Sequence, residues 1–136
     1  APQHVLWNYD NLDPVVARQT GAHAVDNLSS KVVRQLVKGA ADGYLSSEDG
    51  HHNYTDGMKK IEVPIFFVVG GLDQMAPPAV MVEAFRKVQS KDKRIEILSR
   101  ANGYAHDYGH VDLVLGKTAP REVFPLLEQW LMQHEG

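Results

Sequence analysis

The sequence predicts an α/β fold built on parallel strands, and three observations support that prediction. Residues 61–73 (IEVPIFFVVGGLD) hold a continuous apolar run that ends at two glycines, which is typical of a strand buried on both faces. Residues 77–90 follow a helical period that begins at a Pro-Pro pair, and residues 94–98 (RIEIL) alternate polar and apolar side chains. A strand, a helix and a second strand within about 40 residues form a βαβ unit, whose strands pair in parallel.

The composition is that of a globular protein and excludes several functional classes. Hydrophobic residues make up 43% of the 136 positions and charged residues 23%. A formal net charge of −3 gives no electrostatic basis for a nucleic-acid partner, and no apolar stretch approaches the length of a membrane span. The absence of cysteine excludes a disulfide framework, a thiolate metal site and a cysteine nucleophile within these residues. The totals leave the cellular compartment open.

The first 60 residues are less regular than the rest. Residues 1–26 show no clean period and resemble a covering segment, or the middle of a longer chain. Residues 29–38 are predicted to form an amphipathic helix with a serine at its start and Gly39 as its stop. Residues 39–60 are rich in Gly, Asp, Ser and His, so we expect a loop with one short helical turn near residues 54–59.

The chain after the second strand is predicted to be a loop followed by a helix. Residues 99–109 contain two glycines and are expected to be irregular, whereas residues 119–134 place apolar side chains on one side of a helix. Two parallel strands that are both predicted to be interior cannot complete a sheet or satisfy its backbone groups. We therefore expect the rest of the sheet to lie on sequence outside these 136 residues, rather than in hidden strands of the first half.

Two residues that follow successive strands are candidates for catalysis. Asp73 stands just beyond the glycines of the first strand, and His110 follows the second strand and its loop. The carboxyl ends of parallel strands meet at one edge of a sheet, where ligands gather. A carboxylate on the Nδ1–H group of a histidine lets Nε2 take a proton from a hydroxyl, and Gly109 leaves space for a close approach. The alternatives are a turn acid at Asp73 and a structural loop histidine at His110.

Other polar residues near His110 are interpreted as structural. His106 lies earlier in the loop and is expected at the surface or at a pocket rim. Asp112 is expected to orient local backbone or to pair with a lysine. A metal site made of His106, Asp107, His110 and Asp112 is disfavoured, because Gly109 breaks the helix that would align two of them. We predict neither a metal nor a cofactor.

Two segments carry a resemblance to a known family. GGLDQMAPP (residues 70–78) and YGHVDLVLGKTAPREVFPLLEQWL (residues 108–131) resemble the C-terminal third of an α/β-hydrolase. Within that superfamily the chain is most similar to the acid-lipase and polyhydroxyalkanoate-synthase-like branches, over about residues 61–134. The resemblance implies that Asp73 is the acid and His110 the base of a catalytic triad.

The same resemblance implies a division of the chain into two parts. Residues 1–60 would be the helical cap or lid that commonly precedes the acid-bearing strand of such enzymes. Residues 61–136 would be the C-terminal βαβα segment of the α/β-hydrolase core, with a sheet that is incomplete on its own. The implied activity is hydrolysis of carboxylic esters, of the esterase or lipase type.

The nucleophile of that family is missing from this sequence. It stands in a Gly-x-Ser-x-Gly elbow, which does not occur here, and Ser46 and Ser47 lie in GYLSSEDG without the glycine spacing or a preceding strand. We therefore expect a companion polypeptide, or a missing N-terminal portion, to carry the elbow and act with this chain on a small acyl ester. The alternatives are an acyltransferase of the polyhydroxyalkanoate-synthase type, with a cysteine on the missing part, and a non-catalytic binding protein of the same fold.

Overall fold

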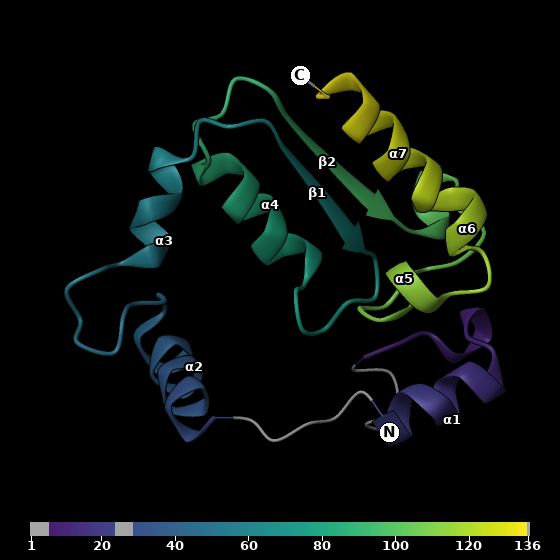
Figure 1. Cartoon of the computed structure of the whole chain (residues 1–136), viewed down its shortest axis with the longest axis horizontal. Helices are drawn as coiled ribbons and strands as arrows, with labels where there is room; N and C mark the ends of the chain where they lie inside the picture. The colour runs from purple at the N-terminus through teal and green to yellow at the C-terminus, as the bar shows by residue number, and fades with distance from the viewer. Residues whose placement is uncertain (1–5, 24–28, 136) are drawn as a thin grey trace.

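The computed structural model describes residues 6–23 and 29–135, and it places two parallel strands between two layers of helices (Figure 1). Strand β1 (Ile65–Gly70) pairs in parallel with β2 (Lys93–Leu98), with Ile65 opposite Lys93 and Gly70 opposite Leu98. The predicted α/β class and the parallel pairing of these two strands are therefore confirmed. Both strands run with their carboxyl ends toward the same edge, where the loops before α4 and before α5 begin.

Helix α4 (Pro78–Lys87) covers one face of the pair. Its proline lies in the first turn, where a missing N–H group costs least. Phe85 packs edge-on against Phe67, with the ring centroids 5.8 Å apart, and Val69 and Val88 are buried beside them. This cluster fixes the strand faces, so that Phe67 and Val69 point toward α4 and the alternate residues point the other way.

The other face is covered by two helices where the sequence predicts one. Helices α6 (Ala119–Glu122) and α7 (Phe124–Gln133) meet at Val123, which is buried. Pro125 lies in the first turn of α7 and cannot donate a backbone hydrogen bond to the preceding turn, so the single long helix is replaced by two. Trp130 of α7 packs against Phe66 of β1, with 5.3 Å between ring centroids.

The first half of the chain contains a helix that the sequence analysis missed. Helix α1 (Pro14–His23) begins at a proline, and the Asp13 carboxylate accepts a hydrogen bond of 2.7 Å from the Val15 N–H group. Helix α2 (Ser30–Asp42) is longer than predicted. It continues through Gly39 and ends at Gly43, whose φ of 74° lies in the left-handed region that glycine favours.

The remaining elements are short. Helix α3 (Tyr54–Gly57) and the 3-10 turn η3 (Met58–Lys60) confirm the predicted helical turn. The other short helices are η2 (Tyr9–Asn11), η4 (Arg100–Asn102) and α5 (Asp112–Leu115). Over the described ranges, no helix is long and apolar enough to cross a membrane.

Residues 6–12, which we call the N-terminal strap, lie along the loop that carries His110. Leu12 forms an antiparallel bridge with Gly116, and the Lys117 N–H group donates to the Asn11 carbonyl at 2.7 Å. The Val111 N–H group donates to the Leu6 carbonyl at 2.8 Å. In the part of the first half that the structure describes, only this bridge and one at Ser46 form strand-like pairs, so no further strand joins the sheet there.

Candidate active site

The structure brings Asp73 and His110 together at the carboxyl end of the sheet. His110 Nδ1 lies 2.8 Å from Asp73 Oδ2, across 37 positions of the chain. Asp73 follows β1 by three residues, and His110 lies in the loop that connects β2 to α5. The two candidates predicted from the strand ends are therefore hydrogen-bonded to each other.

The two carboxylate oxygens of Asp73 have different partners. Oδ1 accepts hydrogen bonds of 2.8 Å from the N–H groups of Met75 and Ala76, whereas Oδ2 faces His110. The side chain is 2% exposed. Asp73 is therefore both a turn acid and the partner of the histidine, since each oxygen serves one role. The turn holds the carboxylate in place, which presents a fixed acceptor to the imidazole.

The second ring nitrogen of His110, Nε2, is not used in the contact with Asp73. Its side chain is 44% exposed, and the described residues form no hydrogen bond with Nε2. The carboxylate accepts only, so the Nδ1 atom is assigned as the protonated nitrogen of the neutral ring. In that tautomer Nε2 carries a lone pair and can receive a proton from a group in front of it.

Close backbone packing sets the histidine loop against β1. The Leu72 N–H group donates to the Tyr108 carbonyl at 2.8 Å. A Cβ atom on Gly70 would lie 2.5 Å from the Tyr108 oxygen and 2.6 Å from the Gly109 oxygen. Only glycine allows that approach, which explains why the last residue of β1 is a glycine.

A buried tyrosine ties the same loop to α6. The Tyr108 hydroxyl lies 2.6 Å from Thr118 Oγ1 and donates to Glu122 Oε2 at 2.7 Å. Burial raises the pKa of Tyr108 to about 12, and the nearby Glu122 carboxylate acts in the same direction. The hydroxyl therefore keeps its proton at neutral pH. The sequence analysis missed this contact, because nothing in the spacing of Tyr108 and Glu122 indicates it.

Asp112 is fully buried and binds backbone, in agreement with the structural role that the sequence predicts. Its Oδ1 atom accepts from the N–H groups of Asn8 and Gly109 at 3.0 and 2.9 Å, and Oδ2 accepts from Asn11 Nδ2 at 3.2 Å. Asn8 and Asn11 were not predicted. Both belong to the N-terminal strap and lie about a hundred positions from Asp112, a separation that no local pattern reveals.

The other candidates lie apart from the pair. His106 is half-buried, and its Nδ1 atom has no hydrogen-bond partner. No group of three or more acidic or histidine side chains in the described ranges could hold a metal. Ser47 hydrogen-bonds to Asp49 within its own loop, and Ser46 pairs with Asn53 there. These contacts hold both serines within their own loop and bring neither of them to the His110 imidazole.

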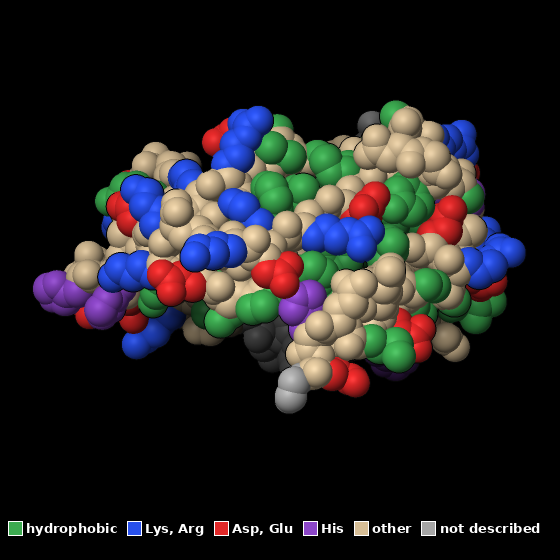
Figure 2. All heavy atoms as spheres, turned by 90° about the horizontal axis from the view of Figure 1, so that it is seen from above, with side chains coloured by type: hydrophobic (Ala, Val, Ile, Leu, Met, Phe, Trp, Pro, Cys, Tyr) green, Lys and Arg blue, Asp and Glu red, His purple; other side chains and the backbone are tan. Residues whose placement is uncertain are grey.

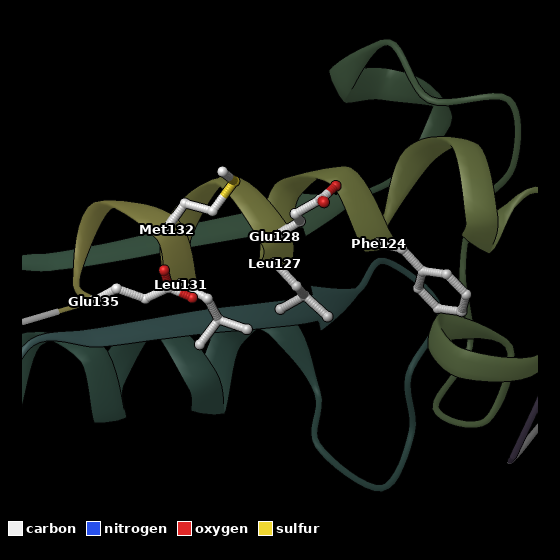
Figure 3. A pocket seen from close by; sticks show the side chains of 6 residues that line it. All are labelled: Phe124, Leu127, Glu128, Leu131, Met132 and Glu135. Atoms are coloured by element: carbon white, nitrogen blue, oxygen red, sulfur yellow. The ribbon is translucent and has the colours of Figure 1, made fainter.

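An apolar groove runs along α7, away from the Asp73–His110 pair. Figure 3 shows Phe124, Leu127 and Leu131 projecting from one side of the helix, with Glu128 and Met132 on the other. All three apolar side chains on that side are exposed, and the Asp73–His110 pair is not part of the lining. The space-filling view likewise shows apolar side chains at the surface among the charged ones (Figure 2).

No protein-family model, no curated protein and no solved structure matches this chain. The geometry of the pair and the resemblance of its two motif segments are therefore the basis for a function.

Proposed function

We propose that this chain supplies the acid and the base of a serine hydrolase that cleaves carboxylic esters on an α/β-hydrolase fold. The observation that carries the proposal is the 2.8 Å contact between His110 Nδ1 and Asp73 Oδ2, in a histidine whose side chain is 44% exposed. The resemblance of residues 70–78 and 108–131 to the acid-lipase branch supports the same function. A buried acid that is hydrogen-bonded to a histidine makes up two of the three members of a catalytic triad.

The chemistry assigned to the pair is proton transfer at Nε2. His110 takes the proton of a serine hydroxyl as its oxygen attacks the acyl carbonyl, and Asp73 stabilises the imidazolium that forms. Nε2 then gives the proton to the leaving alcohol, which leaves an acyl ester on the serine. In the second half His110 takes a proton from water as the water oxygen attacks the acyl carbonyl. Nε2 then gives that proton to the serine oxygen as its bond to the acyl group breaks, which releases the acid and the free serine. Asp73 stays ionised throughout.

The serine is proposed to lie on a companion polypeptide or on further sequence of the same protein. The reaction needs a nucleophile, and the sequence has no Gly-x-Ser-x-Gly elbow and no cysteine to supply one. The edge of β1 gives further support. The N–H groups of Ile65 and Gly71 donate to Asp92 and Leu98 on the β2 side, so those of Phe66 and Val68 face the other way. Further strands of the sheet, which would carry the elbow and its oxyanion hole, could pair with β1 at that edge.

A fluorophosphonate probe, which labels serines activated by a histidine, tests the proposal. The tagged protein is isolated from its source under native conditions with whatever is bound to it, and is then treated with the probe. We expect a label on the serine of a Gly-x-Ser-x-Gly elbow. We expect that label to be lost with His110→Gln and with Asp73→Asn, while Ser47→Ala leaves it unchanged.

Each other outcome counts against the ester-hydrolase proposal. A label that is indifferent to His110, or no labelled serine at all, contradicts it. A cysteine alkylated in a His110-dependent way points to the alternative acyltransferase, in which the same pair would activate a thiol. If neither nucleophile is found, the fold would serve binding in a non-catalytic protein.

A further inference from the structure

A buried polar cluster joins the N-terminal strap to the loop that carries His110. Asn11 and Asp112 are both fully buried, and Asn11 Nδ2 donates to Asp112 Oδ2 at 3.2 Å. The Asn11 carbonyl oxygen Oδ1 accepts from Thr118 Oγ1 at 2.9 Å. This second bond fixes the direction of the Asn11 amide, because its nitrogen must then face Asp112. Asp112 forms no ion pair with any described residue, and its two oxygens accept hydrogen bonds from neutral donors only.

The cluster and the strap hold the backbone on both sides of His110. On one side the Gly109 N–H group donates to Asp112 Oδ1 at 2.9 Å, and on the other the Val111 N–H group donates to the Leu6 carbonyl at 2.8 Å. The imidazole itself is nearly half exposed and has Asp73 as its partner. Its place in front of Asp73 therefore depends on where these two neighbouring residues hold the backbone.

Packing leaves little freedom in that arrangement. A Cβ atom on Gly109 would lie 2.7 Å from Asp112 Oδ1 and 2.7 Å from Trp7 Cα of the strap. A Cβ atom on Gly116 would lie 2.6 Å from Asn11 Nδ2. The two glycines flank the cluster and let the strap and the loop approach each other to within contact distance.

We propose that Asp112, oriented by Asn11 of the N-terminal strap, is a positioning residue that holds the His110 imidazole with its Nδ1–H group on Asp73. This inference rests on the proposed function, since it assigns to Asp112 the task of preparing the base of that reaction. Asp112 does not touch the reacting atoms. It acts through the Gly109 backbone, and the strap is the part of the chain that keeps its carboxylate aimed.

An exchange of the two side chains tests the proposal. Asp112→Asn places an amide nitrogen against the Asn11 nitrogen, so that two donors face each other. Asn11→Asp places two carboxylates against each other. The double variant Asn11→Asp/Asp112→Asn restores one donor and one acceptor. The carboxylate introduced in the strap can still accept from Thr118, and the amide oxygen introduced in the loop can still accept from the N–H groups of Asn8 and Gly109. The pair of side chains keeps its size and its total charge in this exchange.

The readout is the tautomer of His110, measured from the ¹⁵N chemical shifts of its ring nitrogens in the full chain. The measurement is made at a pH above the range in which histidines ordinarily carry a charge, and His110→Gln assigns the ring signals. We expect the Nδ1–H form in the unmodified protein and its loss in Asp73→Asn, where an amide nitrogen faces Nδ1. We expect loss of that form in Asp112→Asn and in Asn11→Asp, and its recovery in the double variant.

Urea unfolding and a second control separate positioning from general stability. Ser90→Ala removes a buried hydroxyl that donates to the Asp92 carbonyl at 2.9 Å, remote from the strap, and should leave the tautomer unchanged. An Nδ1–H form that survives in folded Asp112→Asn would overturn the positioning role. So would a double variant that regains stability without regaining that form. If the unmodified protein lacks the Nδ1–H form, the triad of the proposed function fails, and the positioning role fails with it.

Discussion

Asp73 uses one carboxylate oxygen to hold its own turn and the other to bind His110, whose Nδ1 atom lies 2.8 Å away. The two roles can be separated, because an asparagine keeps a carbonyl oxygen for the turn but has no negative charge for the imidazole. The division links the end of β1 to the chemistry proposed at His110.

Replacing Asp73 by asparagine and by alanine should separate those roles. We expect Asp73→Asn to change the free energy of unfolding by less than about 1 kcal/mol, since its oxygen still accepts from Met75 and Ala76. Asp73→Ala leaves both N–H groups without that acceptor and should cost about 1–3 kcal/mol. Urea denaturation followed by circular dichroism measures both. Equal stability of the two variants would show that the turn does not depend on Oδ1.

The glycine before the histidine should be intolerant of a side chain. Gly109→Ala would force a methyl group against Asp112 and Trp7, so we expect a loss of about 1–3 kcal/mol in the free energy of unfolding. Gly21→Ala in α1 is the matched control. A Cβ atom there meets nothing within 4 Å, and alanine favours a helix over glycine by about 1 kcal/mol. A tolerant Gly109 would contradict the close packing of the strap on the loop.

Tyr108 should make the protein sensitive to alkaline pH. Its pKa is raised to about 12 in the folded state, whereas an unfolded tyrosine has a pKa near 10. The protonated Tyr108 therefore contributes fully to the free energy of unfolding below pH 10. That contribution is lost as the pH rises from 10 to 12, because the unfolded state then loses the tyrosine proton first. Tyr108→Phe removes the hydroxyl bonded to Glu122, which should cost about 1–3 kcal/mol at pH 7 and flatten the stability profile above pH 10.

Urea unfolding at pH 7, 9, 10 and 11 gives that profile. Tyr104 is a second tyrosine whose pKa is raised to about 12, mainly by burial and also by its hydrogen bond to Glu96. Because Tyr104 is still present in Tyr108→Phe, that variant should still lose some stability at alkaline pH. We expect Tyr104→Phe to remove this remaining loss. A profile that is unchanged in both variants would contradict the assignment.

The edge of β1 that faces away from β2 should be visible in hydrogen exchange. Alternation along a parallel strand turns the N–H groups of Phe67 and Val69 toward β2 and those of Phe66 and Val68 away from it. We expect slow amide exchange at the first two and fast exchange at the other two in the isolated chain. Binding of a companion strand at this edge should slow Phe66 and Val68 selectively. Four equally fast amides would show that the strand pair itself is open.

The central unit could be predicted from sequence because its signals are local. The apolar run of β1, the alternation of β2 and the proline-led α4 each lie within one element, and Asp73 and His110 follow from where strands end. The break at Val123 and the start of α1 also had local signals, in Pro125 and in the Asp13–Pro14 pair. Helix α1 is only weakly amphipathic, so the apolar stripe by which helices are usually recognised is weak there.

The support of the site could not be predicted in the same way. The contacts between Asn11 and Asp112 and between Tyr108 and Glu122 depend on how distant elements pack. A single sequence carries no pattern that pairs a strap residue with a loop residue about a hundred positions later. The polar character of these residues indicates only that each needs a partner when it is buried.

The strap also imposes an order on the assembly of the molecule. The Asn8 N–H group and the Asp112 carboxylate that it binds are separated by 104 positions, so this contact closes a long loop. The β1–α4–β2 unit needs far shorter loops and should form earlier in refolding. During synthesis, Asn8 leaves the ribosome 104 residues ahead of Asp112, its binding partner. His110 would therefore be immobilised late, after Asp73 already has its place at the end of β1.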